Sequence, residues 1–299
     1  MSSPEGAPGG EVAAFERRLR QAGIRRQQEP GDRELAALLE RIDTRRRRRF
    51  DPTSPVDAAS PVGPVSPGES GAPGTVLSIE RVGAHIRIFR VAPPAGFRFR
   101  AGQYVKVGTG TGKRRSFSLA SAPHEDHVEL CVGLNPGGRL TPALFALRPG
   151  DRLDIDPRPR GSFGRVSSAR RHLLVATGTG IAPLRSIVRD ALHRGSGDEF
   201  LILHGASHPD GLPYRDELAA LAASHPRVTY EPTVSRPEAS PAPAWSGRTG
   251  RVDPLALAVA RALDRRDTHA YACGNPGMVA SLTAALRGEG FAVSQEAFD

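Results

Sequence analysis

The stretch Leu174-Val175-Ala176-Thr177-Gly178-Thr179-Gly180-Ile181-Ala182-Pro183 decides the fold of the second half of the chain. An apolar strand runs into a glycine-rich turn and then into a helix with proline near its first turn. Glycines let a pyrophosphate approach the backbone, and a helix N-terminus favours its negative charge. The stretch is not the G-x-G-x-x-G fingerprint, and an ordinary strand–helix turn has the same pattern. Alone it predicts a nucleotide site only moderately well.

Strands and helices alternate around that turn. Apolar strands are expected at 173–176, 200–204, 228–231 and 270–273, helices at 183–193, 214–223, 254–263 and 277–287, and a final strand at 291–299. This alternation implies a parallel sheet with crossover helices. Such sheets bind nucleotides at the carboxyl ends of their strands. We therefore assign residues 168–299 to a parallel-sheet nucleotide-binding domain.

The preceding residues have a different pattern. Short β-rich runs separated by glycine or proline are expected as strands at 75–82, 85–91, 103–107, 115–120, 127–134 and 152–155, with a short helix at 141–147. Closely spaced strands with turn signals indicate an antiparallel barrel. The predicted fold class is thus β + α/β, with an antiparallel barrel over 75–167 followed by the α/β domain.

Residues 1–74 are predicted to stand apart from both domains. Phe15, Leu19 and Ile24 have helical spacing, and Leu35, Leu38, Leu39 and Ile42 form a better stripe. A run of arginines, 45–49, precedes a Pro/Ser/Gly-rich linker at 51–74. A disordered or weakly helical solvated tail is favoured over a docking arm for an acidic partner.

Composition excludes several classes of protein. The 299 residues carry a net charge of +9, but no nucleic-acid motif accompanies it. No long apolar run predicts a membrane span or secretory signal, so a cytoplasmic location is expected. The only cysteines, Cys131 and Cys273, are too few for a plant-type iron–sulfur cluster, which takes four thiolates. No metal site is predicted.

Two motifs in the barrel offer polar groups to a ligand. In Arg115-Ser116-Phe117-Ser118, the arginine fork suits a diphosphate and the aromatic ring suits stacking on a flat ligand. In Gly137-Gly138-Arg139-Leu140-Thr141, Thr141 is expected to cap the following helix, leaving free amides for a phosphate. Each has a plain structural alternative: a barrel strand with an exposed arginine, and a cap without a ligand.

A fourth motif, Cys273-Gly274-Asn275-Pro276-Gly277-Met278, ends one strand and begins a helix. It places a thiol at the carboxyl edge of the sheet, although a buried structural cysteine is equally compatible with the pattern. Taken in order, RSFS, GRLT, ATGTGIAP and CGNPGM resemble the ferredoxin–NADP reductase family, and within it the bacterial flavodoxin/ferredoxin–NADP reductases. Gly102-Gln103-Tyr104 also resembles a family barrel strand, so the resemblance covers residues 75–299.

The resemblance implies FAD as cofactor and NADP(H) as substrate, so that 75–167 is the FAD-binding domain and 168–299 the NADP-binding domain. The implied cofactor-binding residues are Arg115, Ser116, Phe117, Ser118, Leu134, Gly138, Leu140, Thr141, Thr179, Gly180, Ser235, Arg236, Arg251, Gly274, Asn275 and Phe298. Ser118, Cys273 and Glu296 are the implied catalytic residues, shaping hydride geometry and protons at the flavin. Phe298 would cover the flavin until nicotinamide displaces it, or else belong to the core.

Two positions depart from the family pattern. Phe117 stands where tyrosine is usual, which keeps stacking but removes a phenol hydrogen bond. Ser207 stands where bacterial relatives often have arginine, so one contact to the 2′-phosphate is missing. Val234-Ser235-Arg236 and Gly250-Arg251-Val252 match the family, and Arg236 and Arg251 are therefore the predicted discriminators of NADPH from NADH.

The expected function is electron transfer between NADPH and a separate ferredoxin or flavodoxin, by a protein taken to be a monomer. One alternative is an NADH-linked reductase component of an oxygenase. Another is a flavin-binding electron-transfer subunit with little activity of its own, although its nearest family case carries extra cysteines that this chain lacks.

Overall fold

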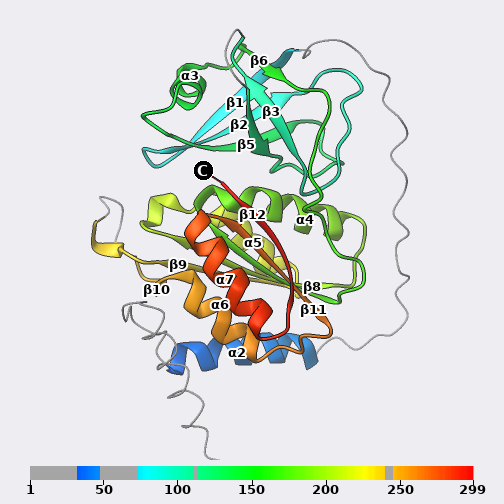
Figure 1. Ribbon diagram of the computed structural model, residues 1–299, viewed down its shortest axis with the longest axis vertical. Coiled ribbons are helices and arrows are strands. Elements are labelled where there is room, and N and C mark those ends of the chain that lie inside the picture. Colours follow the sequence, from blue (N-terminus) through cyan, green and yellow to red (C-terminus); the bar gives the residue numbers. More distant parts are fainter. Residues whose placement is uncertain (1–31, 48–72, 111–113, 240–244, 299) are drawn as a thin grey trace, which may run out of the picture.

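The computed structural model describes residues 32–47, 73–110, 114–239 and 245–298. An antiparallel sheet lies at one end of the molecule and a parallel sheet flanked by helices at the other (Figure 1). The predicted fold class, a barrel followed by a parallel-sheet domain, is confirmed.

The antiparallel sheet comprises β1 (Pro73–Val82), β2 (Ile86–Ala92), β3 (Tyr104–Gly108), β4 (Arg115–Ser118), β5 (Val128–Gly133) and β6 (Arg152–Ile155). Its order is β4-β3-β6-β1-β2-β5. An antiparallel bridge between Leu119 and Leu130 joins the two outer strands, closing the sheet into a barrel around buried apolar side chains. A short helix, α3 (Leu140–Ala146), fills the connection from β5 to β6, as the sequence predicts.

The parallel sheet comprises β7 (Arg171–Thr177), β8 (Glu199–Ala206), β9 (Val228–Val234), β10 (Arg248–Thr249), β11 (Thr268–Gly274) and β12 (Ala292–Ala297). Its helices are α4 (Ile181–His193), α5 (Arg215–Ser224), α6 (Val252–Arg261) and α7 (Pro276–Gly288), with single turns η1 (Gly178–Gly180), η2 (Pro209–Gly211) and η3 (Pro237–Ala239). The strand order is β10-β9-β8-β7-β11-β12. Successive strands are added on one side of β7 up to β10, and β11 and β12 are added on its other side, so the topological switch point lies between β7 and β11. Ligands bind open α/β sheets at such a switch point.

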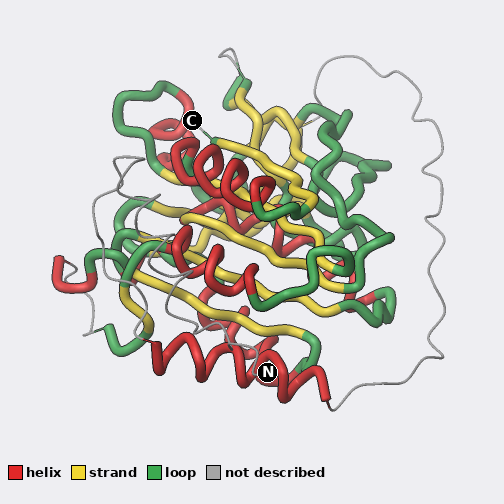
Figure 2. Tube along the Cα trace, turned by 60° about the horizontal axis from the view of Figure 1, so that its bottom comes forward, coloured by secondary structure: helices red, strands yellow, loops and turns green. Residues whose placement is uncertain are grey.

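Helices cover both faces of this sheet (Figure 2). Side chains alternate along each strand, so that Leu173 and Val175 of β7 pack toward α6 and α7, while Leu174 and Ala176 pack toward α4 and α5. Burial on both faces explains why the central strands are continuously apolar rather than alternating. None of the described helices is long and apolar enough to cross a membrane.

Helix α4 fastens the two domains together, lying between the barrel and the sheet (Figure 1). Arg185 donates to Ala120 O at 2.6 Å, and Ser186 donates to Ser121 O at 2.6 Å. Arg185 also lies 3.3 Å from the fully buried carboxylate of Glu129. Burial alone would raise the pKa of Glu129, but Arg185 and Arg90 together hold that pKa below its ordinary value. Glu129 is therefore ionised, and the interface depends on its partners.

The N-terminal segment differs from the detached tail that the sequence predicts. Residues 32–47 form helix α2 (Asp32–Arg47), which lies below α6 (Figure 1). Leu38 is fully buried, and Leu35 and Ile42 pack against the same cluster of α6 and α7 side chains. The predicted apolar stripe thus packs on the nucleotide domain instead of facing solvent. The stretch around Phe15, the end of the arginine run and most of the linker lie outside the described residues.

Candidate functional site

The glycine-rich turn after β7 lies against the turn after β11. A β-carbon on Gly180 would lie 2.5 Å from Cys273 O. Gly274 has φ +126°, and a β-carbon there would overlap the Thr177 hydroxyl and lie 2.7 Å from Thr177 O. Only glycine fits at these two positions, because any side chain would force the turns apart. The sequence therefore brings the two turns together into one platform at the carboxyl edge of the sheet.

Two helices begin at this platform. Asn275 N donates to the Thr177 hydroxyl at 2.8 Å, and the Asn275 side-chain oxygen accepts from Met278 N at 3.2 Å, capping α7. Helix α4 begins directly after η1. Unpaired amides and the partial positive charge at both helix N-termini favour a phosphate here.

His204, near the end of β8, holds the glycine-rich turn of the platform through a hydrogen bond to Gly178. Its Nε2 lies 2.9 Å from Gly178 O, and its Nδ1 lies 3.2 Å from the Tyr230 hydroxyl. A carbonyl only accepts, so Nε2 carries the hydrogen and Nδ1 accepts from Tyr230. Burial lowers the pKa of His204 to about 4, so the ring is neutral at physiological pH. Sequence reasoning missed this role; the available signal was a histidine ending an otherwise apolar strand.

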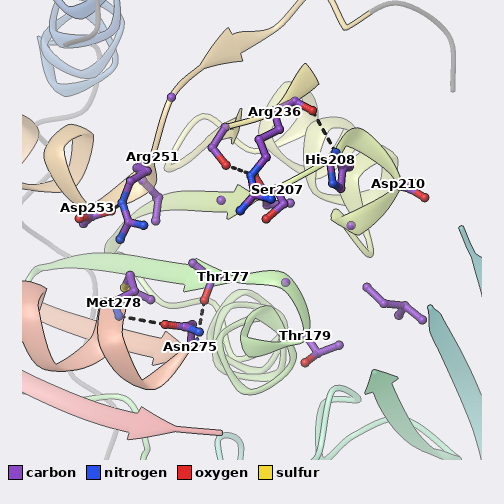
Figure 3. A pocket seen from close by; sticks show the side chains of 18 of the residues that line it. Thr177, Thr179, Ser207, His208, Asp210, Arg236, Arg251, Asp253, Asn275 and Met278 are labelled. Carbon is purple, nitrogen blue, oxygen red and sulfur yellow. Dashed lines mark hydrogen bonds and ion pairs between the residues drawn. The ribbon is translucent and has the colours of Figure 1, made fainter. Parts of the chain in front are cut away.

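A first cleft of about 520 Å³ opens above the platform (Figure 3). Five of the predicted nucleotide-binding residues line it: Thr179, Ser235, Arg236, Arg251 and Asn275. Ser207, His208 and Asp210 line it as well, and His85 and Ile86 contribute a wall from the barrel. Gly180 is buried and absent from this lining, so its part in the site is the close approach to Cys273.

The two arginines in this cleft differ in their partners. Arg251 donates to Asp253 Oδ1 at 2.9 Å and is half exposed. Arg236 is exposed, and its side chain has no ion-pair partner among the described residues. Its backbone is fixed: Arg236 N donates to Ser207 O at 2.8 Å, and Arg236 O accepts from His208 Nδ1 at 3.0 Å. Among the described residues, the Arg236 guanidinium therefore has no neutralising partner, and two hydrogen bonds fix its backbone.

A second cleft, of about 1180 Å³, lies between the barrel and the parallel-sheet domain. The barrel residues predicted to bind flavin all line it: Arg115, Ser116, Phe117, Ser118, Leu134, Gly138, Leu140 and Thr141. Thr179, Gly274, Asn275 and Phe298 line the opposite side. The predicted residues thus meet around a single opening, although they come from segments more than 150 positions apart in the sequence.

Thr141 does not cap α3, contrary to the expectation. The residue before the helix is Arg139, which makes no side-chain capping bond. The Thr141 hydroxyl instead accepts from Asn135 N at 2.9 Å and donates to Asn135 O at 3.1 Å. Because this hydroxyl lies inside the first helical turn, it reaches back to the loop rather than to the helix amides. It fixes the turn 135–141 along the second cleft.

The three predicted catalytic residues have different surroundings. Ser118 donates to Glu296 Oε1 at 3.5 Å, the long end of the hydrogen-bond range. Burial raises the pKa of Glu296 to about 7, opposed by the Ser118 bond, and Glu296 Oε2 is buried with no hydrogen-bond partner among the described residues. Cys273 is fully buried and lines neither cleft. Burial, and secondarily Glu296, raise the pKa of the Cys273 thiol, which stays protonated.

Phe298 lies partly in the apolar core and partly in the lining of the second cleft. Its backbone N donates to Gly274 O at 2.9 Å, which fixes the segment after β12 against the platform. The ring is half-buried, packs against the apolar cluster that contains Phe163 and Tyr271, and also lines the second cleft. Phe298 is therefore a side wall of the cleft with apolar support behind it.

Comparison with known proteins identifies both halves of the chain. An oxidoreductase FAD-binding domain matches residues 73–166, and an oxidoreductase NAD-binding domain matches residues 174–283. The chain is 38% identical to ferredoxin–NADP reductase B of Sorangium cellulosum over 210 residues, which cover 67% of this chain and 84% of that protein. It is 32% identical to a terephthalate 1,2-dioxygenase reductase component of a Comamonas species, covering 67% of this chain but 59% of that protein.

Solved structures show the same architecture. A ferredoxin NADP+ reductase from Neisseria gonorrhoeae, with bound FAD and NADP, superposes with a TM-score of 0.68 at 24% identity, covering 77% of this chain and 99% of that chain. A cytochrome P450 reductase from Amycolatopsis superposes with a TM-score of 0.67 at 30% identity, covering 76% of this chain and 69% of that chain. The match begins near the first barrel strand in sequence, so α2 lies outside both matched domains.

Proposed function

The chain belongs to the ferredoxin–NADP reductase family of FAD- and NAD(P)-binding oxidoreductases, and from that premise we propose that it transfers electrons between NADPH and a separate ferredoxin or flavodoxin. The observation that carries the choice of NADPH is Arg236, an exposed guanidinium in the first cleft without an ion-pair partner in the described part of the chain. A relative at 38% identity is named for ferredoxin and NADP, which supports the choice of partner.

The second cleft fits FAD. It brings a guanidinium, an aromatic ring and hydroxyls of β4 together with the glycine turn 137–141. Ser118 of this lining bonds to Glu296, whose other carboxylate oxygen is buried with no hydrogen-bond partner among the described residues. When bound, FAD accepts hydride from nicotinamide and passes electrons on singly. We assign Arg115 and the 137–141 amides to its phosphates, and Phe117 and Phe298 to its ring.

Ser118 and Glu296 hold and transfer protons at this cleft. A carboxyl whose pKa lies near 7 exchanges its proton readily at neutral pH. The Ser118 hydroxyl holds Glu296 Oε1, which leaves Oε2 as the oxygen that takes or gives the proton. Cys273, kept neutral by burial, contributes shape and the absence of charge behind the platform.

The first cleft takes the dinucleotide. The platform of Thr177, Thr179 and Asn275 lies where the two clefts adjoin, since these three residues line both. A pyrophosphate on the platform would let nicotinamide extend toward the second cleft and the 2′-phosphate toward Arg236. Arg251 joins that contact by leaving or sharing Asp253.

The test is steady-state reduction of purified ferredoxins and flavodoxins by the full chain, with NADPH and NADH compared side by side. The proposal expects bound FAD, NADPH oxidation and faster protein reduction with NADPH. A purified chain without FAD, or one that oxidises neither dinucleotide, contradicts it.

A second candidate is an NADH-linked reductase component of an oxygenase. It is favoured by relatives such as the terephthalate and naphthalene dioxygenase reductase components, each 32% identical. The chain spans 59% and 62% of their lengths. The pairing of Arg251 with Asp253 also leaves Arg236 as the one arginine of the first cleft, among the described residues, without an ion pair for a 2′-phosphate. Preference for NADH in the same assay would establish this candidate instead.

Cytoplasmic location and a monomeric state complete the proposal. Both cysteines are free and buried, in keeping with a reducing compartment. Size-exclusion chromatography with light scattering tests the monomer, and fractionation of the source cells tests the location.

A further inference from the structure

Helix α2 is attached to the nucleotide domain by charge as well as by apolar packing. The side chain of Arg248, on β10, is only 5% exposed. It lies 3.0 Å from Glu231 on β9 and 3.1 Å from Glu34 on α2. Arg248 also donates to the Glu34 backbone carbonyl at 3.0 Å, and Arg41 of α2 pairs with Glu231. Each of these partners stabilises the buried charge of Arg248, and two of them link α2 to the edge of the sheet.

The strand held in this way leads directly into the first cleft. β10 has only two residues, and Gly250 and Arg251 follow it. Gly250 N donates to Val234 O at 2.9 Å, and the Thr233 hydroxyl donates to Gly250 O at 2.8 Å. Only two residues, Thr249 and Gly250, therefore separate Arg248, which binds α2, from Arg251, which lines the cleft.

The β-pairing that holds this segment is short. β10 is the outermost strand of the sheet and pairs with β9 through two residue pairs, Arg248 with Thr233 and Thr249 with Val234. A two-residue edge strand is weak by itself, since stable pairing needs more residues and an apolar face. The contacts from α2 to Arg248 therefore add to the hydrogen bonds of Thr233, Val234 and Trp245 that fix this segment.

We propose that α2 positions the β10–Arg251 segment, so that this added N-terminal helix sets the affinity of the cleft for the 2′-phosphate of NADPH. The inference rests on the proposed function of that cleft. Arg248, Glu34 and Leu38 act as positioning residues, because none of them lines the cleft. The ligand class is a dinucleotide or nucleotide carrying a phosphate on its ribose.

The experiment uses the full chain with two variants of different severity. Leu38→Asp removes the apolar contact of α2, and the double variant Glu34→Ala/Arg41→Ala removes its ion pairs. Glu40→Ala, on the exposed face of the same helix, is the matched control. Amide hydrogen exchange of residues 245–252 reports on the segment without nucleotide, and the KM for NADPH and for NADH reports on its consequence.

Both α2 variants should exchange faster at 245–252 and show a KM for NADPH raised about three- to tenfold, as when one charge-assisted contact is loosened. The KM for NADH and the kcat at saturation should stay within about twofold, since neither involves the 2′-phosphate. A purely structural role would instead raise both KM values together, and that result overturns the inference.

Faster exchange with unchanged KM for NADPH also overturns the inference, because the segment would then be loosened without effect on binding. Failure of the proposed function has a different signature. It would show in the unaltered chain as preference for NADH, whatever the α2 variants do.

Discussion

Ser118 and Glu296 meet across the domain boundary, with the serine hydroxyl 3.5 Å from one carboxylate oxygen and the other oxygen buried without a partner among the described residues. Their strands, β4 and β12, are the edge of one sheet and the edge of the other. The contact therefore exists only in the assembled molecule, and it places a carboxyl whose pKa is raised to about 7 next to Ser118, which lines the second cleft.

Replacing Glu296 by glutamine should flatten the pH dependence of turnover. With the carboxyl protonated below about pH 7, wild-type kcat should fall as pH rises through that value. The variant should lack this step and lose about tenfold or more in kcat at pH 6.5, the scale of general acid–base contributions. Glu80→Gln, at an exposed barrel position, is the control. A variant that retains the step near pH 7 contradicts the assignment.

The same substitution has a consequence for stability. The folded pKa of Glu296 is raised from 4.5 to about 7, so the folded state binds the extra proton between those values. The contribution of this group is fully present below about pH 4.5 and is lost as pH rises through about 7. Urea unfolding at pH 5 and pH 8 should therefore show a smaller loss of stability with rising pH in Glu296→Gln than in wild type. Equal losses would argue that the carboxyl is not buried as described.

Removing the Arg236 side chain should affect NADPH selectively. Arg236→Ala should raise the KM for NADPH about 10- to 100-fold, the equivalent of one or two charge-assisted hydrogen bonds, and leave NADH nearly unchanged. Arg170→Ala is the control: Arg170 is exposed just before β7, at the amino ends of the strands and away from the cleft, and its loss should change neither KM value. Parallel changes for both dinucleotides would place the 2′-phosphate elsewhere.

His204 should matter equally for both dinucleotides. His204→Phe keeps the volume but leaves Gly178 O without its donor, which should raise both KM values several-fold, about 1–2 kcal/mol of binding. Because its pKa is lowered from 6.5 to about 4, the stability that His204 contributes is present above about pH 6.5 and is lost as pH falls through about 4. Acid unfolding curves should therefore be shallower in the variant over that range. His204→Gln, whose amide places a donor near the position of Nε2, should show milder changes in both KM values.

Gly274→Ala should destabilise the protein by about 3 kcal/mol or more, because the new β-carbon would overlap Thr177 in a left-handed backbone conformation. Gly288→Ala is the matched control, since a β-carbon there meets nothing within 4 Å. A thermal melt followed by circular dichroism separates the two. If Gly274→Ala melted with wild type, the two turns would not be in contact.

The order of strands and helices was predictable because it depends on local patterns. Each predicted strand of the sheets lies within one or two residues of an observed one at most of its ends, since periodicity and glycine turns are local signals. The site was partly predictable for the same reason: Arg115, Phe117 and Thr179 sit in motifs. Their meeting around one cleft depends on how α4 docks, which a sequence pattern does not contain.

Three features were beyond local reasoning. The stripe of Leu35, Leu38 and Ile42 indicated that a helix could form. The surface on which that helix packs is made by α6 and α7, which are distant from it in sequence, and so no local pattern could predict it. Thr141 had capping chemistry, yet its hydroxyl found a nearer partner in Asn135. The role of His204 depends on a carbonyl 26 positions away in sequence.

The contacts between α4 and the barrel limit how the two domains can be exchanged between homologues. The boundary near residue 167 separates two matched domains cleanly in sequence, yet cutting there would remove the Arg185–Glu129 contact and both α4 hydrogen bonds to the barrel, leaving Glu129 with Arg90 and Arg185 with Glu217. Neither half is then a module that can be exchanged freely with a distant homologue. Successful chimaeras must transfer the loop 120–129 and α4 as a pair.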